Sequence, residues 1–156
     1  MLTEAQANKF LVKMAKRVKK ENKDIIDCLA FIARSEGIKV RFLTNRWGGQ
    51  AFCSEERIEI GLTGISISHA ISQFFHEFSH IICARENLFP AYHRTKLKMS
   101  KADKLAVLRT GLRAELFVDK MAKSISKSYF PGCPFTKAYN TKMDRQKLQT
   151  SLREGL

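Results

Sequence analysis

The spacing of hydrophobic residues in the first part of the chain predicts two amphipathic helices. The first covers residues 3–20 and begins with a capping box formed by Thr3 and Gln6. The second covers residues 23–36 and ends before Gly37, a residue type that commonly follows a helix C-terminus. Lysines recur at three- and four-residue steps along another side of the first helix, where they form a basic stripe: Lys9, Lys13, Lys16 and Lys20.

Shorter alternating stretches follow and predict strands. Residues 39–43 alternate between polar and apolar side chains, and Trp47-Gly48-Gly49 predicts a turn. Residues 51–53 and 57–62 predict two further strands, the second with its isoleucines on one face. We expect these segments to form a small, mostly antiparallel sheet.

The second half of the chain predicts two longer helices, over residues 68–85 and 102–127, with a basic loop or lid at 91–101 between them. Residues 128–140 contain two prolines and a glycine and are expected to be irregular, whereas 141–156 predict a short terminal helix.

The order of helices, then strands, then helices indicates an α+β fold. A length of 156 residues favours one domain, residues 1–156, with one hydrophobic core. Within it, residues 1–24 form a basic N-terminal helix and residues 128–156 a basic C-terminal extension.

The chemistry is concentrated in the helix predicted over 68–85, which contains His76-Glu77-x-x-His80. Residues four apart project from one face of a helix, so His76 and His80 can hold one metal ion between their imidazoles. Glu77 is rotated by about 100° from His76 and lies beside the ion, where its carboxylate can act as a general base. Zinc suits this ligand chemistry, since three protein ligands leave a fourth position for water.

A catalytic zinc site of this kind needs a third protein ligand, and two candidates follow the motif. His93 lies 13 residues after His80, beyond Pro90, and Glu115 lies 35 residues after His80 on the next helix. We favour Glu115, because it and Asp119 interrupt the apolar stripe of that helix, and a buried carboxylate needs a cation or strong donors.

A metal ion for Glu115 and an imidazole N–H for Asp119 satisfy both carboxylates, because metal-binding histidines usually donate their second N–H to such a group. The alternative is that the two acids pair with basic neighbours at the edge of the helix. Those neighbours are Arg109, Arg113 and Lys123.

Together these residues resemble the gluzincin pattern, HExxH followed by ExxxD. More narrowly, residues 25–127 resemble the ImmA/IrrE-like metallopeptidases of mobile elements and stress responses, and more weakly ArdC-like antirestriction domains. The resemblance implies a zincin-like fold in which the HExxH helix and a second ligand-bearing helix pack on the sheet. It implies that zinc is held by His76, His80 and Glu115, that Glu77 is the general base and that Asp119 supports a ligand. In the SprT-like proteases, which the chain also resembles, the third ligand is a histidine, and His93 takes that place.

We therefore expect an intracellular zinc-dependent metallopeptidase that hydrolyses peptide bonds in a protein substrate, such as a DNA-bound regulator. A further donor commonly stabilises the oxyanion in this chemistry. His93 is our candidate for that catalytic role, and the tyrosines near the same regions are others: Tyr92, Tyr129 and Tyr139.

The charge of the chain supports a rival interpretation. A net charge of +13 and a pI near 9.9 favour polyanionic partners, chiefly nucleic acid. The rival is a basic nucleic-acid-binding or interaction protein with a structural or inactive zinc site. A structural site normally fills all four positions with protein ligands, and Cys83 or His93 would have to supply the fourth.

The expected compartment is the cytoplasm, and we expect no membrane partner. The N-terminus has no apolar core behind a basic segment, as a secretory signal requires, and no apolar run approaches the roughly 20 residues that span a bilayer. The four cysteines lack close pairing, so we expect free thiols that are mostly buried.

Overall fold

The computed structural model describes residues 1–89 and 101–136 of the chain. In chain order the elements are α1 (Glu4–Glu21), α2 (Lys23–Ser35), β1 (Lys39–Leu43), β2 (Gly49–Phe52), the 3₁₀ turn η1 (Cys53–Glu55), β3 (Arg57–Gly61), α3 (Ile67–Arg85) and α5 (Lys101–Tyr129). The described residues thus form an α+β fold, as the sequence predicted, and contain four helices and one three-stranded sheet.

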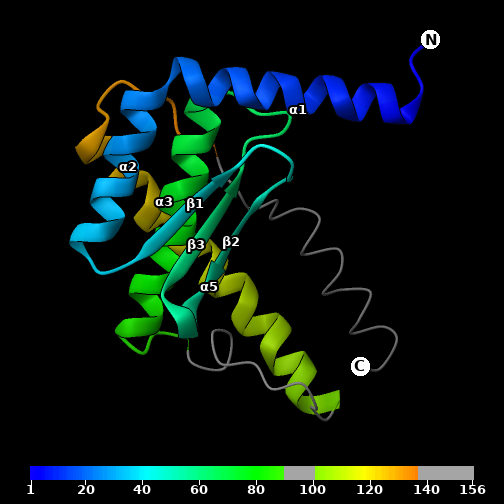
Figure 1. The fold of residues 1–156 in the computed structure, drawn as a ribbon. Helices are drawn as coiled ribbons and strands as arrows, with labels where there is room; N and C mark the ends of the chain where they lie inside the picture. Colours follow the sequence, from blue (N-terminus) through cyan, green and yellow to red (C-terminus); the bar gives the residue numbers. More distant parts are fainter. Residues whose placement is uncertain (90–100, 137–156) are drawn as a thin grey trace.

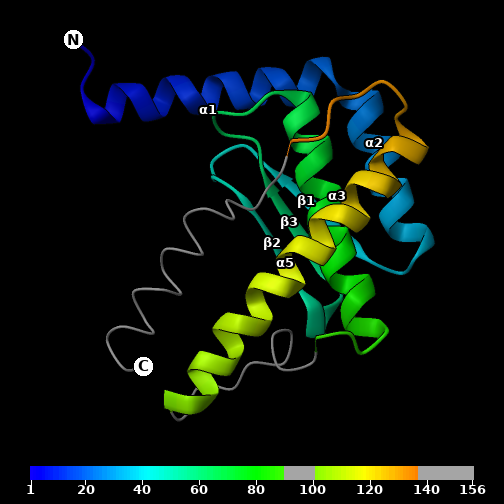
Figure 2. The same cartoon turned by 180° about the vertical axis from the view of Figure 1, so that it is seen from behind.

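The elements are arranged in layers behind one open face of the sheet. Helix α3 packs on the back of the sheet, and α5 crosses behind α3, as the view from the other side shows (Figure 1, Figure 2). Helix α2 lies beside β1, and α1 passes one end of the sheet and extends beyond it. No labelled element lies in front of the sheet in Figure 1. The two longest helices therefore lie on the same side of the sheet, one upon the other.

The sheet is mixed, which corrects the expectation of a mostly antiparallel one. Its strand order is β1-β3-β2, with β1 parallel to β3 and β2 antiparallel to β3. Strands β1 and β2 follow each other in the chain but do not pair, because β3 is inserted between them. Since β1 and β2 run in opposite directions, the inserted strand must be parallel to one and antiparallel to the other.

The connection between β1 and β2 crosses the end of β3 and makes this insertion possible. The amide of Gly61 at the end of β3 donates to the carbonyl of Gly48 at 2.8 Å, and the amide of Thr63 donates to that of Arg46 at 3.3 Å. A Cβ at Gly61 would lie 2.2 Å from the Arg46 carbonyl oxygen, so only glycine fits under the crossing chain. The predicted turn at residues 47–49 is thus part of the connection that crosses the end of β3.

The core lies between the sheet and α3. Ile58 and Ile60 of β3 are fully buried, and Phe42 of β1 stacks on Phe74 of α3 with ring centroids 6.4 Å apart. Burying such side chains is the main favourable term in folding. Helix α3 is buried on nearly every side, because the sheet covers one face and α5 the other.

The local signals at the helix ends were predicted well. The capping box of Thr3 and Gln6 is present in both directions, and Gly37 adopts the left-handed conformation at φ +70°. The last helix reaches Tyr129, two residues into the segment expected to be irregular. The predicted loop at 91–101 falls almost wholly, and the predicted helix at 141–156 entirely, outside the described residues. None of the helices in the described part of the chain combines the length and apolar character that a membrane crossing requires.

Candidate metal centre

Helix α3 presents the two histidines of the predicted motif to α5. Its N-terminus is capped by Ser66, whose hydroxyl accepts from the amide of His69 at 3.2 Å. Two turns further on, His76 and His80 lie one above the other, with ring centroids 4.7 Å apart and planes at 82°. Both rings are buried, so their polar nitrogens need partners inside the protein.

Helix α5 supplies these partners with two carboxylates one turn apart. Glu115 and Asp119 are both buried, in a stretch where Ala114, Val118 and Ala122 are fully buried against the rest of the protein. The two acids are thus buried among apolar residues, as predicted, although the side chains of Leu108 and Leu112 in the predicted stripe lie outside the described residues. The basic side chains offered as alternative partners, Arg113 and Lys123, are exposed. The side chain of Arg109, the third alternative, lies outside the described residues.

Three potential ligand atoms converge on one point. The His76 Nε2 and His80 Nε2 atoms are 3.1 Å apart, and the Glu115 carboxylate places one oxygen 3.0 Å from the first and the other 3.1 Å from the second. The three residues form the metal-competent group found among the described residues. Ligands at the usual zinc distances of about 2.0–2.1 Å stand roughly 3.3 Å apart around a tetrahedral ion. The observed contacts, two of which end on different oxygens of Glu115, are only slightly shorter than the edges of such a tetrahedron.

The hydrogen bond between His76 and Asp119 fixes which nitrogen faces this point. His76 Nδ1 and Asp119 Oδ1 are 2.8 Å apart. An ionised carboxylate only accepts, so Nδ1 carries the proton and Nε2 of a neutral ring presents its lone pair. When the ring is neutral, that lone pair faces a carboxylate and a second imidazole nitrogen. A cation between them resolves the clash, so the donor set fits a zinc ion bound by His76, His80 and Glu115.

The electrostatics of the pocket favour a positive charge. Burial lowers the pKa of His76, but the hydrogen bonds to Asp119 and Glu115 and the negative charges of Glu77 and Glu115 raise it to about 10. The carboxylates around this ring therefore stabilise a cation strongly, whether a proton on the ring or a metal ion beside it. Metal binding has to displace that proton.

Glu77 points into the same cleft from the next position of α3. Its carboxylate accepts a hydrogen bond from the backbone of Ala51 on β2, the strand that borders the cleft. A Cβ on Gly49 of β2 would lie 2.8 Å from Gln73 Cγ and 3.1 Å from the Glu77 side chain. Glycine at this position lets the strand approach α3 closely enough to hold Glu77 in place.

The environment also prepares Glu77 for proton transfer. Burial raises the pKa of its carboxyl above the ordinary value, while the charges of His76 and His80 and the amide of Ala51 oppose that rise. A carboxylate whose pKa lies above 4.5 is a better base at neutral pH than an exposed one.

These groups line an open cleft of about 400 Å³. Strand β2 forms one wall and the motif helix the other, and Glu115 of α5 lies at the base with the histidines. Among the described residues β2 pairs only with β3, so its second edge is free to face the cleft. The lining residues are Gly49, Gln50, Ala51, Cys53, His76, Glu77, His80 and Glu115.

The cysteines are free thiols, as predicted, but only Cys83 is buried, so the expectation that most are buried is wrong. Cys83 Sγ contacts Met121 Sδ at 3.9 Å and is not in the metal-competent group. Cys53 lines the cleft, and burial, with the nearby Glu77 and Cys83, raises its pKa to about 11. Its thiol therefore keeps its proton and donates to the His80 carbonyl at 3.7 Å.

The predicted oxyanion donors have different outcomes. His93, together with Tyr92 and Tyr139, lies outside the described residues. Tyr129 stacks on Phe75 with ring centroids 5.9 Å apart and lines a separate pocket on the far side of α3. Gly49 and Ala51 were missed as site residues, because a glycine beside a turn indicates the turn and not the carboxylate that it will face.

Comparisons with known proteins identify no relative: no family model, no curated protein and no solved structure matches this chain.

Proposed function

We propose that this protein is a zinc-dependent metallopeptidase that cleaves peptide bonds in a protein substrate. The observation that carries the proposal is the convergence of His76 Nε2, His80 Nε2 and the Glu115 carboxylate within 3.0–3.1 Å of one another. A base, Glu77, lies in the same cleft. Bound there, zinc supplies Lewis acidity that makes a water molecule nucleophilic at neutral pH.

Three residues of the chain have further roles in the proposed reaction. Asp119 keeps the proton on His76 Nδ1, so that Nε2 stays a lone-pair donor. Glu77 accepts the proton of the attacking water on its carboxylate and returns it to the leaving amine. The Ala51 amide holds that carboxylate in the cleft between these two steps.

The free edge of β2 supports an extended peptide as substrate. Backbone groups on an unpaired strand edge recognise a peptide by adding it to the sheet, which does not depend on the peptide's sequence. Gly49, Gln50 and Ala51 all line the cleft, so a peptide added along this edge passes Glu77 and the histidines.

The number of ligands among the described residues argues for catalysis over a structural ion. Within the described residues the metal-competent group has three members, whereas structural zinc sites usually have four protein ligands. The cleft beside the group leaves room for water and substrate.

The test combines zinc content with peptide cleavage. The zinc-loaded protein is incubated with an unfolded peptide library, and new termini are counted by mass spectrometry. We expect Glu77→Gln to keep full zinc and to lose at least about 100-fold in cleavage, because it removes the base alone. We expect His80→Ala to lose zinc. Cleavage by Glu77→Gln at the wild-type rate, or none by the wild type, overturns the peptidase assignment, and full zinc in His80→Ala overturns the metal site.

A further inference from the structure

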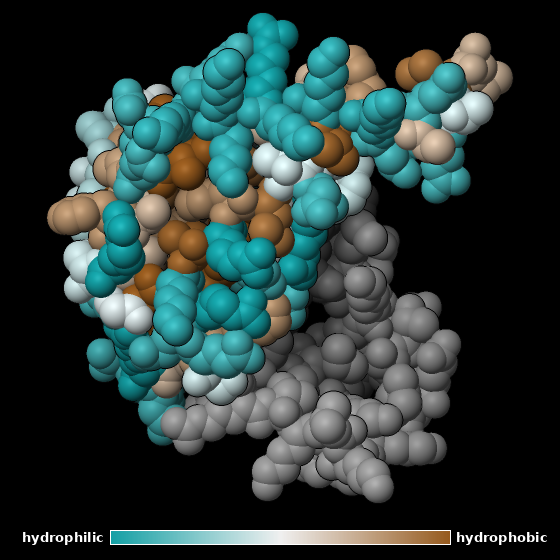
Figure 3. All heavy atoms as spheres, viewed as in Figure 1, coloured by the Kyte–Doolittle hydropathy of each residue, from teal (hydrophilic) through white to brown (hydrophobic). Residues whose placement is uncertain are grey.

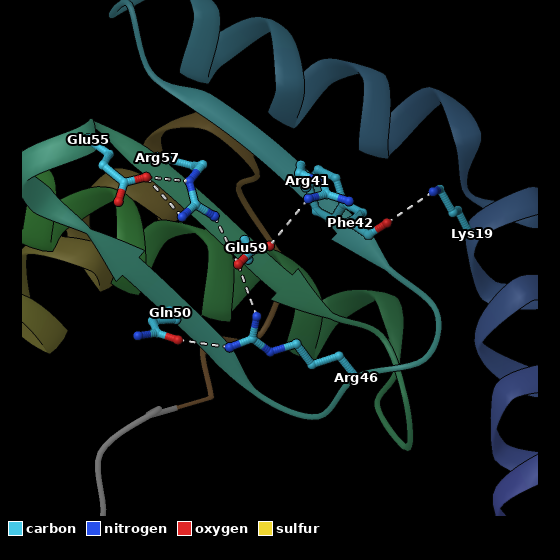
Figure 4. Close-up of polar contacts among 8 residues, drawn as sticks. All are labelled: Lys19, Arg41, Phe42, Arg46, Gln50, Glu55, Arg57 and Glu59. Carbon is cyan, nitrogen blue, oxygen red and sulfur yellow. Dashed lines mark hydrogen bonds and ion pairs between the residues drawn. The ribbon is translucent and has the colours of Figure 1, made fainter.

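The open face of the sheet carries a compact cluster of arginines. Side chains alternate along a strand, so the residues beside the buried isoleucines of β3 point away from α3. Glu59 occupies the centre of this face, in register with Arg41 of β1 and Gln50 of β2 (Figure 4). We define the outer-face cluster by the basic residues Lys39, Arg41, Arg46 and Arg57 around Glu59.

Glu59 arranges these guanidinium groups. Arg46 Nη1 and Arg57 Nη1 each lie 3.0 Å from Glu59 Oε1, and Arg41 Nη1 lies 3.8 Å from Oε2. Arg46 also donates to Gln50 Oε1 at 2.8 Å. These contacts hold the planar groups in defined orientations, which lowers the entropy lost when they bind an anion.

The charge of the cluster is not balanced. Its three arginines pair with two carboxylates, Glu59 and Glu55, and the exposed Lys39 adds a fourth positive charge. The side chain of Arg41 is 66% exposed. Each guanidinium has five N–H donors, so donors remain directed to solvent after the contacts with Glu59 are made. A network that served stability alone would not need this positive excess at the surface.

The connection that carries Arg46 also carries an exposed aromatic ring. Trp47, the one tryptophan of the chain, directly follows Arg46 and is 61% exposed. Its ring packs on Gly64, where a Cβ would lie 2.5 Å from Trp47 Cζ3 and where φ is +72°. An exposed indole that rests on a glycine required by both space and backbone conformation is a ready stacking platform.

More positive charge lies next to this face. Lys19 of α1 donates to the carbonyl of Phe42 on β1 at 3.0 Å, which ties the basic helix to the sheet edge (Figure 4). The lysines predicted as a stripe on α1 are exposed. The space-filling view from the same side shows hydrophilic side chains along α1 and over the front of the sheet, with hydrophobic atoms between them (Figure 3).

We propose that this surface binds single-stranded nucleic acid. Phosphates lie on the guanidinium groups of Arg41, Arg46 and Arg57, and a base stacks on Trp47. Fork-shaped guanidinium groups match phosphate oxygens, and a basic surface with an aromatic platform is the arrangement that single-strand binders use. A duplex keeps its base faces stacked inside and cannot use the indole, whereas a lone phosphate needs only one of the three arginines.

The proposed nucleic-acid surface adjoins the metal cleft at Gln50. Gln50 accepts from Arg46 on the outer face and also lines the metal cleft. A bound strand therefore passes along the β2 edge, next to the site where a peptide is proposed to lie. The binding itself does not depend on zinc or on Glu77.

The test measures binding of a labelled oligothymidylate of about 15 nucleotides by anisotropy, and of an unlabelled one by quenching of Trp47 fluorescence. We expect binding that weakens steeply between about 50 and 200 mM salt. Lys39→Ala with Arg41→Ala should weaken binding about tenfold at low salt and flatten the salt dependence. Trp47→Ala should weaken it about tenfold with an unchanged salt dependence.

The control removes the same charge from another surface. Lys120→Ala with Lys127→Ala, at exposed positions of α5, should bind within about twofold of the wild type, as should Glu77→Gln. Thermal melts establish that each variant is folded. Equal weakening by the control pair, unchanged binding by both outer-face variants, or equal affinity for duplex overturns the proposal. Competition by inorganic phosphate alone at low millimolar concentration overturns it too, because that identifies a single-anion site.

Discussion

Two glutamates of this protein are equally buried but lie among very different partner groups. Glu59 on the sheet and Glu115 on α5 each retain 7% of their surface exposed. Glu59 is surrounded by guanidinium groups, whereas Glu115 faces two imidazole nitrogens. Guanidinium groups are charged at every physiological pH, and imidazoles are neutral when they act as metal ligands.

The contrast separates a carboxylate held by permanently charged side chains from one held by titratable rings. Burial raises the pKa of Glu59, but the hydrogen bond and charge of Arg57 and those of Arg46 outweigh it and leave the pKa below its ordinary value. The neighbours of Glu115 are titratable instead: the His76 ring, with a pKa of about 10, carries a proton without a metal ion and becomes neutral when it binds one. A proton on His76 and a metal ion beside it are therefore alternative partners for the Glu115 carboxylate.

Removing the two carboxylates in turn gives the largest expected difference. Glu115→Ala should lower zinc affinity by at least about 100-fold, because one of three protein ligands is lost. Glu59→Gln should leave zinc affinity unchanged. Competition against a chromogenic chelator measures both. Equal zinc affinity in Glu115→Ala and the wild type would contradict the assignment of Glu115.

Removing Asp119, which contacts the ligand His76, should lower zinc affinity less than removing the ligand Glu115. Asp119→Ala should weaken zinc binding about 10- to 100-fold, because His76 loses the acceptor that orients its ring. Asp119→Asn keeps an acceptor without the charge and should fall between Asp119→Ala and the wild type. If both variants bind zinc like the wild type, the 2.8 Å contact has no role in the site.

Zinc should act as a cross-link between α3 and α5. At a free concentration about 100 times its Kd, it adds about 2.7 kcal/mol to stability, which raises Tm on the order of 5–10 °C for a chain of this length. Scanning calorimetry with and without a chelator measures the shift. His80→Ala is the control, and its Tm should not respond to the chelator.

The smallest expected effect is that of Glu59 on thermal stability, which should depend on pH. Since the folded pKa of Glu59 is below the unfolded value, its contribution is present above the unfolded pKa and is lost as pH falls through the folded one. Glu59→Gln should therefore lower Tm by a few degrees at neutral pH, and the difference should shrink below about pH 4.5. A Tm difference that stays constant from neutral to acidic pH would show that Glu59 acts through packing alone.

The candidate metal centre was predictable because its residues follow helical periodicity. His76 and His80 are one turn apart, and so are Glu115 and Asp119, so each pair shares a face whatever the helices pack against. Even the contact between Asp119 and a ligand histidine follows from the need of a buried carboxylate for a donor. The placement of Glu77 against Gly49 was not predictable, because it depends on how closely β2 approaches α3.

The sheet was harder to predict for the same reason. Alternation locates strands and gives their faces, but it does not say that β3 lies between β1 and β2. The cluster around Glu59 also depends on that insertion, since Arg41 reaches Glu59 only from a neighbouring strand. Alternation indicates that Glu59 faces away from the isoleucines and thus predicts that this side chain is exposed to solvent. In the structure three arginines cover it.

The insertion of β3 also sets the order in which the chain can fold. Within the described residues, β1 and β2 each have β3 as their only partner in the sheet. The connection from β2 to β3 is short, so the hairpin between them forms by local closure, while β1 must wait to add to its other side. During synthesis, a chain that ends before residue 57 holds two strands without a partner. The sheet can therefore form only after β3, the last of its strands to be synthesised, is present.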